Sequence, residues 1–275
     1  MIGRILVALG SGPSSSSAVQ QAIELARLHG AELSAVALFD LPRLGHVGPA
    51  PIGGGSAGVE LRRYRLTTAE HSLEEAIAEF ESACVMAGLQ HHVCREEGDP
   101  IDRLVALSRY YDLVVAGLHG LLEWGVIDEP PDELVELIGG GVRPIIAAAQ
   151  AVRRIRRVMI AYSGSVESAS TMKRFIQLRL WPDVHIKLVT FSDDADRGER
   201  LLADAAHYCR SHGYGPELEV VAGSPKRHLL EQARAWHADL LVVGNSAQGL
   251  LRRRLFGETA LHVVRHAELP LFLSQ

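Results

Sequence analysis

The chain of 275 residues has few cysteines and no long apolar run. Its three cysteines, Cys84, Cys94 and Cys209, are odd in number and show no CxxC spacing, which favours reduced thiols over a disulfide framework. No apolar run approaches the roughly 18–20 residues that a membrane helix needs. The apolar run near the N-terminus is too short for a signal peptide. These absences predict a soluble protein in the cytoplasm.

Basic residues are also fewer than acidic ones. The formal net charge is −5 at neutral pH, and the calculated pI is near 6.2. Because no overall positive charge draws the chain toward nucleic acid or an anionic membrane, we expect neither as a partner. The length is enough for one large or two medium domains, each able to bury a core.

What the sequence does contain is an internal repeat. RILVALGSGPSSSSA, which begins at Arg4, resembles RVMIAYSGSVESAS, which begins at Arg157. EGDPIDRLVALSRYYDLVVAG, ending at Gly117, resembles AGSPKRHLLEQARAWHADLLVVG, ending at Gly244, and each copy closes on a proline-led apolar run, RPIIAAA or LPLFLS. The order of these matches is kept, so the chain contains two copies of one unit. We expect domains at 1–148 and 157–275 with a linker at 149–156.

Within each copy, short apolar runs alternate with segments of helical spacing. We expect strands at 5–9, 32–39, 91–94, 113–116 and 144–148, and again at 157–162, 184–191, 217–222, 240–243 and 270–274. In the first copy the expected helices include a long one at 59–86 and shorter ones at 101–109 and 132–138. Alternating strands and helices imply βαβ crossovers, so the fold class is α/β, with two Rossmann-like units that each have a parallel sheet flanked by helices.

Two such units, each with a Gly-x-Pro turn before its third helix and a glycine after its fourth strand, resemble a tandem universal stress protein. The resemblance covers nearly the whole chain except an insertion at 41–60. It implies a five-stranded parallel sheet of order 3-2-1-4-5 in each half. It also implies that the halves pair through their last strands, as an intramolecular pseudo-dimer. Whether two whole chains form a further homodimer is left open.

The nucleotide-binding members of that family carry Gly-x2-Gly-x9-Gly-[Ser/Thr] after strand four. Glycines let the backbone approach phosphate oxygens, and the last two residues open a helix whose amides bind another phosphate. In the second copy this frame begins at Gly244 and resumes at Gly257, but Ala247 replaces the second glycine. Glu258 stands where the hydroxyl belongs, with Thr259 one step later. A carboxylate in that place repels a triphosphate.

The first copy departs further from the motif. It keeps Gly117 and Gly120, but Pro130, Pro131 and Asp132 follow where Gly-Ser is expected. Proline lacks the amide donor that a phosphate needs, and the segment is acidic, so we expect no nucleotide in this half. The family's aspartate at the end of strand one is also missing, because Gly10 replaces it in this copy.

In the second copy Ser163 takes the place of that aspartate. If ATP binds this chain, the resemblance places it in the second copy. The residues that would contact it are Ser163, Gly244, Ser246, Gly249, Gly257 and Thr259.

Three functions remain open at this point. The first is a stress-response protein that acts by binding a ligand or a protein partner, with reduced or absent nucleotide binding and no catalysis. The second is an ATP-binding tandem universal stress protein with weak ATPase activity. The third is an enzyme of another Rossmann-like family, which is least supported because no acid, base and nucleophile set is recognisable. His91, His92 and Cys94 have no spacing that promises a zinc site, so we expect no metal.

Overall fold

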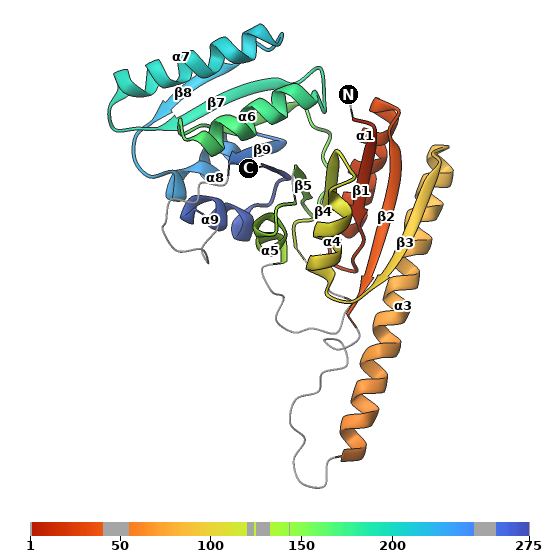
Figure 1. Cartoon of the computed structure of the whole chain (residues 1–275). Coiled ribbons are helices and arrows are strands. Elements are labelled where there is room, and N and C mark those ends of the chain that lie inside the picture. The colour runs from red at the N-terminus through yellow and green to blue at the C-terminus, as the bar shows by residue number, and fades with distance from the viewer. Residues whose placement is uncertain are drawn as a thin grey trace.

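The computed structural model describes residues 2–40, 55–119, 124, 133–142, 144–244 and 257–274. In these residues ten strands form one sheet in the order β3-β2-β1-β4-β5-β10-β9-β6-β7-β8 (Figure 1). The strands are β1 (Arg4–Ala8), β2 (Glu32–Phe39), β3 (His91–Glu97), β4 (Leu113–Gly117), β5 (Ile145–Ala148), β6 (Arg157–Ala161), β7 (His185–Phe191), β8 (Glu217–Val221), β9 (Leu240–Gly244) and β10 (Leu271–Ser274).

The sheet consists of two equivalent halves. The first half has the order 3-2-1-4-5, and the second half repeats it in mirror order along the sheet. Every pairing inside a half is parallel, as expected of buried apolar strands joined by helical crossovers. The predicted α/β class and strand order are confirmed. The proposed domain boundaries stay a prediction, because the two halves share one continuous sheet.

The helices cover both faces of this sheet. They are α1 (Ser15–His29), α3 (Gly55–Ala87), α4 (Pro100–Ser108), α5 (Glu133–Gly139), α6 (Val166–Leu178), α7 (Ala195–Ser211), α8 (Pro225–Ala235) and α9 (Glu258–His266). One apolar core contains side chains of α1, α3, α6 and α7, and a second contains side chains of α4, α5, α8 and α9. The strand faces divide between these two cores, so the molecule has three layers.

The two halves meet at β5 and β10, which pair antiparallel with Ile146 opposite Phe272. Within the second half, α6 holds β10 in place, since the Phe272 ring packs edge-on against Phe175 with centroids 5.3 Å apart. The Thr171 hydroxyl donates to the Ser274 carbonyl at 2.7 Å. The pairing of the halves through their last strands, which the resemblance implied, is therefore confirmed.

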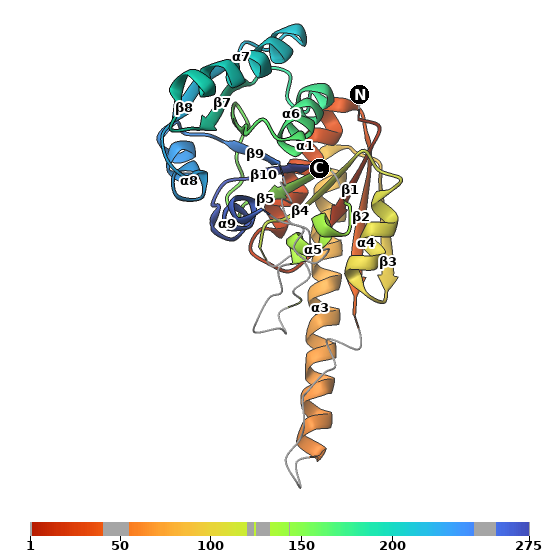
Figure 2. The ribbon, with the colours of Figure 1, turned by 60° about the vertical axis from the view of Figure 1, so that its left-hand side comes forward.

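Two elements run further than the sequence predicted. Helix α3 begins at Gly55, inside the segment expected to be an insertion loop, and its N-terminal part projects beyond the sheet (Figures 1 and 2). Strand β3 continues to Glu97 because its register with β2 extends to the pair Phe39 and Glu97. The charged residues at the end of β3 lie on an edge strand, where alternate side chains reach solvent.

Candidate functional site

A cavity of about 680 Å³ opens in the second half at the carboxyl ends of β6, β7 and β9. After β6 the chain continues into α6 on one face of the sheet, and after β9 it leads toward α9 on the other face. Neighbouring strands whose connections leave in opposite directions create a crevice at their carboxyl ends, where ligands of α/β proteins bind. The cavity is therefore where the topology favours a ligand.

Three of the residues predicted for a nucleotide line this cavity. They are Ser163, Gly244 and Thr259, from the β6–α6 turn, the end of β9 and the first turn of α9. Gly257 is the N-cap residue of α9 and is not among the lining residues. Ser246 and Gly249 lie outside the described residues. The structure brings the first three together, and their role in binding stays a prediction.

The serines of the β6–α6 turn bond to one another. The Ser163 hydroxyl donates to the Ser168 hydroxyl at 3.2 Å, and that hydroxyl donates to the Ser165 carbonyl at 3.0 Å. Ser165 is the N-cap of α6, and its side chain accepts from the Ser168 amide. Within the described residues none of these hydrogen bonds brings a histidine or carboxylate to the serines, so none of them activates a serine as a nucleophile.

Packing explains why residue 244 is a glycine, without reference to a ligand. A Cβ atom added there would lie 2.7 Å from the Ser168 Cα and 2.9 Å from its amide nitrogen. Backbone atoms cannot move aside as a flexible side chain can, so only glycine lets the start of α6 cross the end of β9. The corresponding glycine of the first half, Gly117, is less crowded, with the Ser14 Cβ at 3.2 Å.

Glu258 lies at the first position of α9, and its side chain is 85% exposed. Its carboxylate accepts from the Lys226 ammonium at 3.2 Å. A carboxylate at a helix N-terminus is also favoured by the helix dipole. Glu258 is not a lining residue, so any repulsion of a phosphate acts from outside the cavity and is partly offset by Lys226.

Sequence reasoning missed the contribution of α7. Arg197, Arg200 and Asp204 line the cavity from this helix, which is not part of the glycine motif. Tyr162 lines it as well, and burial together with the charge of Asp204 raises the pKa of its hydroxyl. The i, i+3, i+7 spacing of the three charged residues was visible in the sequence. That this face of α7 covers the β6–α6 turn was not.

The first half has an indole at the matching place. Ala8 pairs with Val36 and Ala161 with Val189, so Leu38 of β2 corresponds to Phe191 of β7, which borders the cavity. The Trp124 ring is 1% exposed, and its N–H donates to the Leu38 carbonyl at 2.9 Å.

In the first half, therefore, a buried tryptophan takes up the end of the second strand. Gly120, Pro131 and Asp132, on which the expected loss of this site rested, lie outside the described residues. The expectation that no nucleotide binds in this half stays a prediction.

The histidines singled out earlier have ordinary packing roles. His91 packs edge-on against the Phe80 ring at 5.6 Å, and its Nδ1 lies 3.2 Å from the Leu89 carbonyl. Over the described ranges no group of three or more His, Cys, Asp and Glu residues is arranged to hold a metal ion. In the same residues no helix is both long enough and apolar enough to span a membrane.

Comparison with known proteins finds similar proteins over most of the chain. Over 208 residues it is 21% identical to the universal stress protein Slr1230 of Synechocystis, an alignment covering 75% of this chain and 69% of that protein. A universal stress protein from Archaeoglobus fulgidus superposes with a TM-score of 0.69 at 15% identity, covering 98% of this chain and 96% of that one. A universal stress protein solved in complex with cAMP aligns with 45% of this chain and 98% of that one, at 25% identity and a TM-score of 0.40.

The model of the universal stress protein family matches residues 1–125 and 194–274, which is more than half of the chain and reaches into both halves. The repeat, the strand order and this match agree. The chain belongs to the universal stress protein family, as a tandem member.

Proposed function

We propose that this chain is a binding protein, not an enzyme, and that its ligand site is the cavity of the second half. One observation carries the proposal. The cavity gathers Ser163, Gly244 and Thr259 around one space, while the matching strand end of the first half is occupied by Trp124. We treat 1–148 and 157–275 as the two domains, so one domain provides the site and the other supports it through the shared sheet.

The expected ligand is a small molecule of the nucleotide class, bound more weakly than by family members with the complete motif. Hydroxyl groups of Ser163, Ser165 and Thr259 offer donors and acceptors inside the cavity. The weakening has two sources. Ser163 provides no carboxylate for a ribose, and Glu258 adds a negative charge near the helix that a phosphate would approach.

The cavity residues support binding more than catalysis. Among the lining residues the titratable groups are those of Tyr162, Arg197, Arg200 and Asp204. No hydrogen bond joins any of these groups to a serine of the β6–α6 turn in the described chain. A general base within hydrogen-bond reach of a nucleophile is the minimum for acyl or phosphoryl transfer to a side chain.

The alternative is an ATP-binding protein with slow hydrolysis. Thr259 favours it, because its position in the first turn of α9 and at the cavity wall suits a phosphate contact. In that case the Lys226 ammonium, which pairs with Glu258 at the start of α9, is one cation of the described residues on the α9 side.

Calorimetric titration with ATP and with AMP, each with and without magnesium, tests both functions. We expect weak binding of one molecule per chain and no phosphate release from ATP above the rate in buffer. Ser163→Asp restores the family's carboxylate and should tighten binding. Ser211→Asp, on the exposed C-terminal end of α7, adds the same charge outside the cavity and should not. Absence of binding by the unmodified chain contradicts the proposal, and sustained phosphate release supports the alternative.

A further inference from the structure

One face of α7 lies along the cavity as a charged row. Arg197, Arg200, Leu201 and Asp204 all line the cavity, and their spacing places them on a single stripe of the helix. The stripe faces the β6–α6 turn and the end of β7. A ligand in the cavity therefore has the α7 row in one wall and Thr259 of α9 in another.

Tight packing fixes this row in place. Gly164 has φ +74°, and a Cβ atom there would lie 2.6 Å from a methyl carbon of Leu201. Gly198 is buried against Val220, whose methyl carbon would lie 2.6 Å from a Cβ atom at that position. Both glycines let α7 approach closely, one toward the turn and one toward the sheet. The arginines are thus carried by a helix that cannot easily move away from the cavity.

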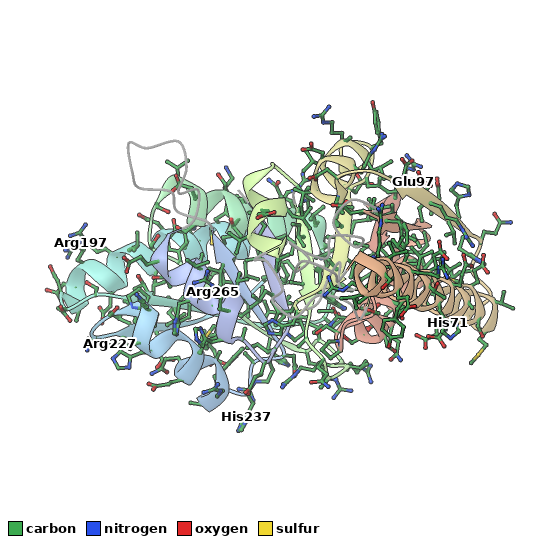
Figure 3. The ribbon with its side chains drawn as sticks, turned by 90° about the horizontal axis from the view of Figure 1, so that it is seen from below. His71, Glu97, Arg197, Arg227, His237 and Arg265 are labelled. Atoms are coloured by element: carbon green, nitrogen blue, oxygen red, sulfur yellow. The ribbon has the colours of Figure 1, made fainter. Side chains whose placement is uncertain are left out.

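Arg197 and Arg200 have no polar side-chain partner in the described part of the chain. Neither guanidinium group forms a hydrogen bond or an ion pair with another described residue. Both side chains are exposed, and Figure 3 shows Arg197 at the outer end of the second half. Arg197 also lies in the first turn of α7, where the helix dipole disfavours a cation. Two unpaired cations at the mouth of a cavity, one in an unfavourable helix position, fit a role in binding an anion.

The first half does not repeat this arrangement. The groove between α3 and the ends of β2 and β3 is lined by Glu70, Glu74, Glu96 and Glu97, with Arg95 paired to Glu74. His71 and Glu97 mark this end of the molecule in Figure 3. The helices that follow the second strand in each half thus bring charge of opposite sign to these two grooves, and of the two the α7 groove is the one that suits an anion.

We propose that the anionic group of the ligand binds at the α7 end of the cavity, between Arg197 and Arg200, with Tyr162 and Asp204 near its sugar hydroxyls. This inference rests on the proposed function and names its ligand class as a nucleoside monophosphate. Two guanidinium groups match one phosphate, because each can donate two parallel bonds to its oxygens. The site reverses the orientation that the glycine loop alone suggests, since Glu258 lies at the opposite end.

The test compares AMP with adenosine, because the two differ only in the phosphate. Titrations of the intact chain give the ratio of the two dissociation constants. We expect AMP to bind about tenfold or more tightly than adenosine, from charge-assisted hydrogen bonds to the phosphate. The double variant Arg197→Gln, Arg200→Gln should bring the ratio close to one and leave adenosine binding unchanged. Arg210→Gln, on the same helix but away from the cavity, should leave both affinities and the ratio unchanged. Thr259→Val removes a hydroxyl from the cavity wall and should change both affinities alike, which keeps the ratio.

The outcomes of these titrations test the inference and the proposed function separately. A ratio that survives in the double variant but is lost in Thr259→Val places the phosphate at the glycine loop and overturns the inference. Equal binding of AMP and adenosine by the unmodified chain overturns it too, while leaving the proposed function in place. Binding of neither compound overturns the proposed function, and the inference with it. Circular dichroism of every variant confirms that a lost ratio reflects binding and not unfolding.

Discussion

The carboxyl ends of β2 and β7 occupy equivalent positions in the two halves, yet a cavity lies at the end of β7 and a buried side chain lies at the end of β2. At the end of β7 the second half has a cavity of about 680 Å³, bordered by serines, a tyrosine and the α7 row. At the matching end of β2 the first half has the buried indole of Trp124, bonded to a strand carbonyl. One large side chain from a distant part of the chain is enough to change what a strand end can hold, since interiors are close-packed.

The glycines at the ends of β4 and β9 also differ between the halves, in how closely neighbouring atoms approach them. A Cβ atom at Gly244 would lie 2.7 Å from the Ser168 Cα, whereas one at Gly117 would come no closer than 3.2 Å to any atom, the Cβ of Ser14 being the nearest. A glycine kept by tight packing and a glycine kept for a phosphate look the same in a sequence. The comparison shows that in the second half the helix contact alone accounts for Gly244.

We expect the largest loss of stability from removing the Trp124 side chain at the end of β2. Trp124→Ala removes a fully buried indole and its bond to Leu38, so the free energy of unfolding should fall by about 3–5 kcal/mol. Urea denaturation measures the loss. Trp124→Phe keeps most of the volume and removes only the N–H donor, so it should cost about 1–2 kcal/mol. Equal costs for the two variants would mean that the indole does not fill the space.

The next effect separates the two glycines. Gly244→Ala forces the start of α6 away from β9 and should destabilise the fold by about 1–3 kcal/mol. Gly117→Ala should cost less than about 1 kcal/mol, because the nearest atom, the Ser14 Cβ at 3.2 Å, has to give way by only a few tenths of an ångström. Thermal unfolding of the two variants under identical conditions gives the comparison. A larger loss from Gly117→Ala would show that the packing difference is reversed.

A smaller effect concerns ligand affinity in the second half. Glu258→Ser removes an exposed carboxylate and releases Lys226, so ATP should bind more tightly. An exposed charge is worth at most about 1 kcal/mol, which corresponds to a gain of up to about fivefold. Calorimetry at one salt and magnesium concentration measures the gain. Lys226→Gln leaves Glu258 unpaired and should weaken binding, whereas an unchanged affinity in both variants would show that this pair lies out of reach of the ligand.

The smallest effect uses one buried thiol in each half. Burial raises the pKa of Cys84 in α3 and of Cys209 in α7 to about 11, from an ordinary 9.0. Between pH 9 and 11 the unfolded chain releases these protons before the folded chain does, so both thiols lower stability as pH rises. At pH 8 a thiol reagent should label Cys94 first, because it is only half-buried.

Mass spectrometry of the labelled peptides then compares the halves. Cys84 and Cys209 should react only as each helix opens, and their rates report the local stability of α3 and α7. Prompt labelling of both in the native state would contradict their burial.

The sequence by itself determined the architecture. Apolar runs of strand length, alternating with helical spacing and repeated twice, leave few arrangements other than two parallel α/β units. Ser163, Gly244 and Thr259 were named from the family resemblance; the structure places all three around one cavity, and their role in binding stays a prediction. The prediction of the architecture succeeded because periodicity is a local property of the chain.

Tertiary structure decided which strand end stays open and what charge surrounds it. Trp124 lies 86 residues beyond the strand carbonyl that it meets, so no local pattern reveals that contact. The α7 row borders the cavity only because Gly164 and Gly198 allow the helix to approach the turn and the sheet. The length of α3 was underestimated as well, since its first turns lack the apolar spacing that marks a buried helix. Contacts between distant segments depend on packing, and packing is settled only when the whole chain is folded.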